Sequence, residues 1–234
     1  MALAHSPRII TDGLVLCLDA GNTKSYPGSG TAWSDLIGSN NGALTNGPTY
    51  SSDDGGAIVF DGSNDYVDCG NVDSNISDNL TLSLWIKFPV GYGPLRWDSI
   101  IAKRAPGNKV NYGINYNPTA TNIFQIYYSN FGASLSVPLS SNFSDNVWIN
   151  ICGTFAKNST TTDMILYNNA SVIGSTNKSG NVTPPANLQL QIGTYLGGGE
   201  YFQGNIAQVS IYNRALTASE VLQNYNATKG RFGI

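Results

Sequence analysis

Residues 80–88, LTLSLWIKF, decide the fold, because apolar and polar side chains alternate along the whole segment. Leu, Ile or Phe stands at every second position from Leu80 to Phe88, whereas Thr, Ser, Trp and Lys stand between them. A period of two places the apolar side chains on one face of an extended strand. The segment therefore predicts a β-strand that lays one face on a hydrophobic core.

The same alternation recurs along most of the chain. Residues 187–193, NLQLQIG, are one further example, and turn residues separate about a dozen short segments of this kind. Short strands with one apolar and one polar face, and with no helical period between them, favour an all-β antiparallel β-sandwich. We expect one sandwich domain over residues 13–228, an N-terminal arm over residues 1–12 and a C-terminal tail over residues 229–234.

One segment has a helical signature. Residues 214–227, RALTASEVLQNYNA, contain the pair Thr217 and Glu220 at the spacing of a capping box, in which each side chain accepts a backbone N–H of the first turn. The segment predicts one short C-terminal helix. We expect its apolar residues, Leu222 and Tyr225 among them, to pack the helix on the sandwich.

Composition excludes several classes of partner. The net charge is −3, so the chain has no broad basic surface for nucleic acid. It has no apolar run long enough to span a membrane.

The start of the chain lacks the features of a secretory signal. We therefore expect a protein made in a reducing cytoplasm, with Cys17, Cys69 and Cys152 as free thiols.

Three segments resemble one family. They are GGAIVFDGSNDYVDCG (residues 55–70), LTLSLWIKF (residues 80–88) and GNIAQVSIYNRALTASEVLQNYNA (residues 204–227). Together, in this order, they resemble the strands and closing helix of laminin-G-like, concanavalin A-like jelly rolls. The resemblance implies a jelly-roll sandwich that covers nearly the whole chain.

A narrower resemblance concerns the two ends of the chain. HSPRIITDGLVLCLDAGN (residues 5–22), YPGSGT (residues 26–31) and NYNATKGRFGI (residues 224–234) resemble laminin-G-like proteins of tailed phages, particularly those of marine bacteria. This resemblance implies a virion structural protein, made in the cytoplasm of the bacterial host, that decorates the capsid or forms part of a tail fibre. Other virion proteins would then be its partners, and it could form a homo-oligomer. We expect the arm or the tail to anchor it.

The same fold also occurs in glycosidases, which need two carboxylates on either side of the scissile bond. This chain has only two glutamates, Glu200 and Glu220, in unrelated contexts. We therefore expect no enzymatic activity, and a glycosidase is the least favoured function.

The family resemblance also implies a structural Ca²⁺. The residues that would supply its oxygen ligands are Asp19, Asn22, Asp35, Asn40 and Gln208. At residues 207–208 the family has acidic ligands, whereas this chain has Ala and Gln. The alternative is that the aspartates of the early loop, the Asp/Asn/Gly-rich part of residues 13–44, only cap turns.

Two glycine-containing loops contain aromatic residues next to polar residues. Carbohydrate-binding sites combine exposed aromatic rings with hydrogen-bonding groups in the same way. The candidate carbohydrate-binding residues are Tyr92, Arg96 and Trp97 in the first loop, and Tyr195, Glu200, Tyr201 and Phe202 in the second. The alternative function is therefore a host-adhesion module that binds cell-surface polysaccharide. The same residue types are also enriched in protein–protein interfaces, so contacts within an assembly and local packing stay open.

Overall fold

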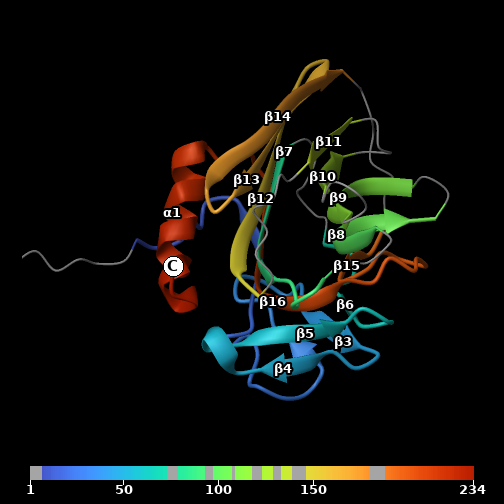
Figure 1. Cartoon of the computed structure of the whole chain (residues 1–234). Coiled ribbons are helices and arrows are strands. Elements are labelled where there is room, and N and C mark those ends of the chain that lie inside the picture. The colour runs from blue at the N-terminus through green and yellow to red at the C-terminus, as the bar shows by residue number, and fades with distance from the viewer. Residues whose placement is uncertain are drawn as a thin grey trace, which may run out of the picture.

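The computed structural model describes residues 7–72, 79–92, 97–106, 109–117, 123–128, 133–138, 146–179 and 188–234. Two antiparallel β-sheets pack face to face, and one short helix lies against the outer face of one of them (Figure 1). The predicted all-β antiparallel sandwich with one short C-terminal helix is confirmed.

Sheet A has eight strands in the described part of the chain. Their order is β14-β13-β12-β7-β16-β5-β4, and β1 pairs with the second half of β16. The bounds are β1 (Leu14–Asp19), β4 (Thr49–Ser51), β5 (Ala57–Asp61), β7 (Asn79–Lys87), β12 (Trp148–Asn158), β13 (Thr161–Asn168), β14 (Ser171–Ser179) and β16 (Gln203–Tyr212). The strand with the clearest alternation, β7, lies in the middle of this sheet.

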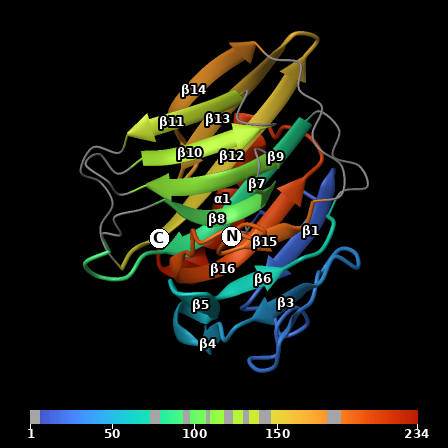
Figure 2. The same ribbon diagram turned by 90° about the vertical axis from the view of Figure 1, so that its right-hand side faces the viewer.

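Sheet B also has eight strands among the described residues, in the order β11-β10-β9-β8-β15-β6-β3-β2. The bounds are β2 (Ala32–Trp33), β3 (Gly42–Thr45), β6 (Tyr66–Asp68), β8 (Asp98–Ala105), β9 (Lys109–Asn117), β10 (Ile123–Tyr128), β11 (Ala133–Pro138) and β15 (Leu190–Ile192). Figure 2 shows this sheet in front, with its outer face toward the viewer. The late strand β15 lies between the early strands β6 and β8, so this face combines distant parts of the sequence.

The core lies between the sheets. On β7, Leu80, Leu82, Leu84 and Ile86 are fully buried in it, as the alternation predicts. The other face of β7 is not solvated, because Trp85 is buried as well. Sheet A is therefore covered on both faces, which the alternation alone does not indicate.

The outer face of sheet A is covered in part by the helix α1 (Ala218–Thr228). Thr217 Oγ1 accepts the N–H of Glu220, and the Glu220 carboxylate accepts the N–H of Thr217 at 2.8 Å. These two hydrogen bonds confirm the predicted capping box. They satisfy backbone donors that the first turn of a helix otherwise leaves without a partner.

The buried face of α1 rests on sheet A. Tyr225 stacks on Trp85 with ring centroids 5.7 Å apart, and Val221 is buried beside Leu216. Leu222 is 49% exposed, so its expected packing role is wrong: it lies on the solvent side of the helix. In the part of the chain that the structure describes, no helix has the length and the apolar run needed to cross a membrane.

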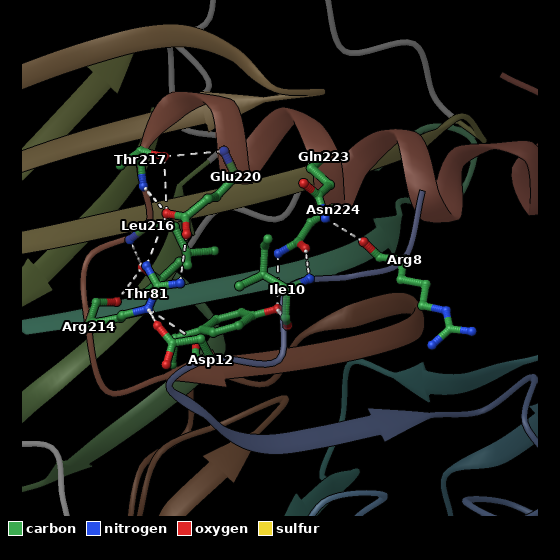
Figure 3. A network of polar contacts seen from close by, with 11 residues as sticks. Arg8, Ile10, Asp12, Thr81, Arg214, Leu216, Thr217, Glu220, Gln223 and Asn224 are labelled. Carbon is green, nitrogen blue, oxygen red and sulfur yellow. Dashed lines mark hydrogen bonds and ion pairs between the residues drawn. The ribbon is translucent and has the colours of Figure 1, made fainter. Parts of the chain in front are cut away.

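The ends of the described chain also lie on sheet A. The Ile10 N–H donates to Asn224 Oδ1 at 2.7 Å, and Gln223 donates to the Arg8 carbonyl at 2.8 Å, which ties residues 7–12 to α1 (Figure 3). The 3₁₀ helix η2 (Lys229–Phe232) follows α1 directly. Its residue Phe232 stacks on Trp85 at 4.2 Å. Residues 229–232 of the predicted tail are therefore packed on the sandwich through Phe232.

Candidate functional site

The structure brings the two predicted aromatic loops together beside β8. The Ser99 N–H donates to the Glu200 carbonyl at 3.2 Å, and Ser99 forms an isolated bridge with Tyr201. Trp97 shortly precedes Ser99, and both Trp97 and Tyr201 are half-buried. One loop leads into β8 and the other leads into β16, so backbone pairing at Ser99 sets their distance.

Tyr92, at the start of the first loop, packs against the core. The ring of Tyr92 lies 4.8 Å from that of Phe88 and 5.8 Å from that of Tyr116, measured between centroids. Tyr92 is half-buried and contributes mainly to packing at this end of the sandwich. Arg96 lies outside the described residues.

Phe202 is not on the surface. Its side chain is fully buried, and its ring meets Phe60 edge-on at 6.0 Å and Phe88 at 5.7 Å. The Phe202 N–H donates to the Gly193 carbonyl at 2.9 Å, which draws the loop back onto the sandwich at this residue. The prediction that Phe202 contacts a carbohydrate is therefore wrong.

Glu200 is held by two side chains of β8. Arg104 Nη1 lies 3.0 Å from Glu200 Oε2, and Ser99 Oγ lies 2.9 Å from the same oxygen. The Arg104 guanidinium also lies over the ring of Tyr195, 3.9 Å from its centroid. The Arg104 and Glu200 side chains are 17% and 22% exposed, so both stay within reach of solvent. This arrangement fixes the second loop and leaves a charge-neutral pair at the surface.

Two further ionisable groups lie close to this pair. Burial, with the charge of Glu200 as a second cause, raises the pKa of Asp98 to about 7. Burial also raises the pKa of Tyr127 above its usual range. Asp98 lies opposite the core residue Tyr116 in the β8–β9 register, so it faces the interior and not the outer surface.

Polar residues form rows across the outer face of sheet B. In one row Ser99 lies opposite Asn115 on β9, Asn115 opposite Gln125 on β10, and Gln125 opposite Ser136 on β11. Ser99 Oγ lies 3.2 Å from Asn115 Oδ1, and Gln125 donates to Ser136 at 3.1 Å. Ser99 and Asn115 are buried, Gln125 is half-buried and Ser136 is exposed, so solvent reaches the amide and hydroxyl groups of this row at the β10–β11 end.

The next row along the same face contains two residues with small side chains or none. Ala102 on β8 lies opposite Gly113 on β9, and Gly113 lies opposite Tyr127 on β10. A Cβ atom added at Gly113 would lie 2.2 Å from Tyr127 Oη, so the tyrosine lies across the glycine. A side chain at residue 113 would displace Tyr127 from the sheet.

Sequence reasoning missed Ser99, Arg104 and Asn115. A signal was present for one of them, because Asn and Gly occupy every second position of residues 111–117, NYGINYN. That alternation identifies a polar face of β9. Nothing in the local sequence pairs Arg104 with Glu200, because Arg104 is on β8 and Glu200 lies in the distant loop between β15 and β16.

The residues predicted to bind calcium do not fit that ion in the early loop. Asp19 forms an ion pair with Arg231 and accepts the Gly21 N–H at 2.9 Å. Asn22 Oδ1 accepts the Lys24 N–H at 3.0 Å. A positive guanidinium beside Asp19 repels a second cation, and the amide of Asn22 caps a turn.

The other predicted ligands also have structural partners. The two Asp35 oxygens accept the backbone N–H groups of Cys17, Ile37, Gly38 and Asn40 at 2.9–3.3 Å. The Asn40 side chain donates to the Val15 carbonyl, and Gln208 stands opposite Asp19 in the β1–β16 register. Over the described ranges, no group of three or more His, Cys, Asp or Glu side chains could hold a metal ion. The turn-capping alternative describes these aspartates better.

Comparison with known families and curated proteins gives one match. A family model described as the concanavalin A-like lectin/glucanases superfamily matches residues 61–222. No curated protein matches the chain.

Solved structures share the fold. Domain 4 of AbnA, an extracellular GH43 arabinanase from Geobacillus stearothermophilus solved with arabinotriose, is 18% identical with a TM-score of 0.65, and the match covers 91% of this chain and 98% of that domain. The binding domain of Paraclostridial Mosquitocidal Protein 1 is 20% identical (TM-score 0.68; 92% of this chain and 52% of that one). Trypanosoma rangeli sialidase is 16% identical (TM-score 0.70; 97% and 36%). At these identities the likeness is one of fold.

Proposed function

Because the chain belongs to the concanavalin A-like lectin/glucanases superfamily, we propose that it is a non-catalytic carbohydrate-binding protein whose binding face is the outer face of sheet B. The observation that carries the proposal is the solvent-reached end of the polar row, Gln125 and Ser136. At the buried end of the row, Ser99 bridges to Tyr201, which is half-buried like Trp97. Sugars are bound by such combinations, because hydroxyls pair with amides while ring faces pack on aromatic side chains.

The charge of this face suits a neutral polysaccharide. Arg104 neutralises Glu200, and the row itself consists of Ser, Asn and Gln side chains. A neutral ligand meets no unpaired charge there, so it loses little solvation when it binds. The arabinanase domain solved with arabinotriose is similar in fold over 91% of this chain, which supports a sugar as ligand.

The absence of catalysis is part of the proposal. The two glutamates lie on different sides of the sandwich: Glu200 is at the outer face of sheet B, whereas Glu220 caps α1 on sheet A and binds Arg214 at 2.7 Å. They cannot stand on either side of one glycosidic bond, as the two carboxyl groups of a glycosidase must. Asp98 faces the interior.

The resemblance of residues 5–22 and 224–234 to tailed-phage proteins supports display on a virion as the setting of this function. In that setting the protein decorates the capsid or forms part of a fibre, and its ligand is a host cell-surface polysaccharide. Immunogold labelling of phage particles, with antibody raised against the chain, tests this setting. Label on the head supports decoration, label on the tail supports an adhesin, and unlabelled particles contradict both.

A glycan array tests carbohydrate binding directly. We expect the unaltered chain to bind one or more neutral polysaccharides, and Trp97→Ala and Tyr201→Ala each to weaken binding by about tenfold or more, because each removes one ring face. Gln125→Ala should weaken binding less, since it removes one hydrogen-bonding group of the row. Isothermal titration with the best ligand measures the three losses.

Leu222→Ala is the matched control, because Leu222 is an exposed apolar residue on α1, on the other side of the sandwich. Its affinity should equal that of the unaltered chain. Near-ultraviolet circular dichroism checks that each variant keeps its fold. The proposal fails if no glycan binds, or if Trp97→Ala, Tyr201→Ala and Gln125→Ala all leave the affinity unchanged.

A further inference from the structure

The Arg231 guanidinium contacts oxygen atoms of three residues, Asp19, Asp54 and Gly56. It forms an ion pair with the Asp19 carboxylate and donates to the carbonyl oxygens of Gly56 and Asp54, the latter at 3.3 Å. The Arg231 and Asp19 side chains are 21% and 20% exposed, so water reaches them only in part. One carboxylate and two carbonyls are the ligand types that hard cations such as Ca²⁺ take.

Glycines shape the cavity that the arginine fills. A Cβ atom at Gly21 would lie 2.5 Å from Arg231 Cζ, and one at Gly55 would lie 2.9 Å from Arg231 Cγ. Gly55 and Gly56 also have φ of 79° and 104°, which glycine adopts without strain. A side chain at residue 21 or 55 would therefore collide with the arginine.

The neighbouring residues hold η2, and with it Arg231, in place. Phe232 stacks on Trp85 and lies 4.8 Å from Trp148, measured between ring centroids. Trp148 Nε1 and Lys87 Nζ each donate to Asp54 Oδ2 at 2.8 Å. The 3₁₀ helix η1 (Asp53–Gly55) is therefore bound from one side by sheet A and from the other by Arg231.

We infer that the Arg231 guanidinium takes the place of a bound cation and joins the end of β1 to η1, so that this corner of the sandwich is formed without calcium. The positive charge that the Asp19 carboxylate needs comes from residue 231 of the same chain. The Ala and Gln at residues 207–208 agree with this, because a guanidinium already paired with Asp19 needs no further carboxylate. The inference does not depend on carbohydrate binding.

Thermal unfolding of the full chain tests the inference, measured in 2 mM EDTA and in 5 mM CaCl₂. We expect the unaltered chain to have the same Tm in both buffers. Arg231→Met keeps most of the stem but removes the charge and the donors, so Tm should fall by about 5–10 °C in EDTA. Calcium should restore part of this loss, because the freed oxygens can then bind it.

Two further variants complete the test. Arg8→Met is the matched control, since Arg8 is exposed and its side chain points away from α1 in Figure 3; its Tm should not change. Arg231→Lys keeps a positive charge but loses the planar set of N–H donors of the guanidinium. Its Tm should therefore be intermediate and should not change with calcium.

Three results would overturn the inference. The first is stabilisation of the unaltered chain by calcium. The second is an Arg231→Met protein that folds in EDTA and shows no calcium response. The third, which remains measurable if Arg231→Met fails to fold, is an Arg231→Lys protein whose Tm rises with calcium.

Discussion

At the scale of single residues, two arginines add side-chain bonds between segments that the backbone also joins to the sheets. Arg104 binds Glu200 from β8, and Arg231 binds Asp19 from η2. Each pair joins residues that are far apart in the sequence, and each carboxylate is partly buried. Removing one partner of such a pair leaves a charge with poor solvation, which costs more than the pair itself contributes.

The cysteines give a prediction at the same scale. Burial raises the pKa of Cys17 to about 11 and that of Cys152 to about 12, and it raises the pKa of Cys69 as well. All three thiols are free, as expected from the sequence, and all three are buried. We expect Ellman's reagent at pH 8 to label none of them in the folded protein within minutes, because the reactive thiolate is absent and access is closed.

The unfolded protein is the control for this measurement. In guanidinium chloride, three equivalents of thiol should react at once, one for each cysteine of the chain. Rapid labelling of one thiol in the folded protein would mean that the strand carrying it opens locally.

At the scale of elements, α1 is held by its first turn as well as by its buried face. Arg214 and the Thr217 N–H bind the Glu220 carboxylate and hold the pKa of Glu220 at about 2. The same turn is joined to the sheet, because Thr81 Oγ1 donates to the Arg214 carbonyl at 2.8 Å and accepts the Leu216 N–H at 2.9 Å (Figure 3).

This turn predicts a pH dependence. The folded pKa of Glu220 lies below the value of about 4.3 in an unfolded chain, so its stabilisation is complete above about pH 5 and is lost as the pH falls toward 2. Glu220→Gln should lower the free energy of unfolding by about 1 kcal/mol at pH 7, and the difference should shrink toward zero near pH 2. Urea unfolding at pH 7, 4 and 2.5 measures it.

Asp12→Asn is the control for Glu220. Asp12 also binds Arg214, at 2.9 Å, but its side chain is 87% exposed. We expect its substitution to change stability by less than about 0.5 kcal/mol at every pH. An equal effect of both substitutions would contradict the role given to the capping box.

At the scale of the whole molecule, the sandwich has a third layer. Residues 9 and 10, α1 and η2 cover the outer face of sheet A, with Trp85 and Trp148 buried beneath them. Trp33 is buried in the core between the sheets instead. Three of the four tryptophans therefore report on two different contacts of sheet A, and the fourth, Trp97, lies directly before β8 of sheet B.

The three-layer arrangement predicts one cooperative transition. Because α1 and η2 share buried aromatic side chains with sheet A, the layer should not melt before the sandwich. Tryptophan fluorescence and far-ultraviolet circular dichroism should give the same midpoint in urea. An earlier transition seen by fluorescence alone would show that the outer layer separates first.

Local pattern predicts some features of this molecule and not others. Alternation at residues 80–88 predicts the central strand, and the spacing of Thr217 and Glu220 predicts the start of α1. The burial of Phe202 and the pairing of Arg231 with Asp19 depend on how distant segments come together, and no short window of sequence contains that information. For the same reason the polar row beginning at Ser99 emerges only when β8, β9, β10 and β11 are set in register.

The placement of both described chain ends has a consequence for how the molecule can be tethered. Residues 7–12 and η2 lie on the α1 side of the sandwich, and the outer face of sheet B points the other way (Figure 1). A support or fusion partner held next to residues 7–12 or η2 would stand on the α1 side of the domain, away from that face. Immobilisation at these segments therefore presents the same surface every time, whichever segment is used.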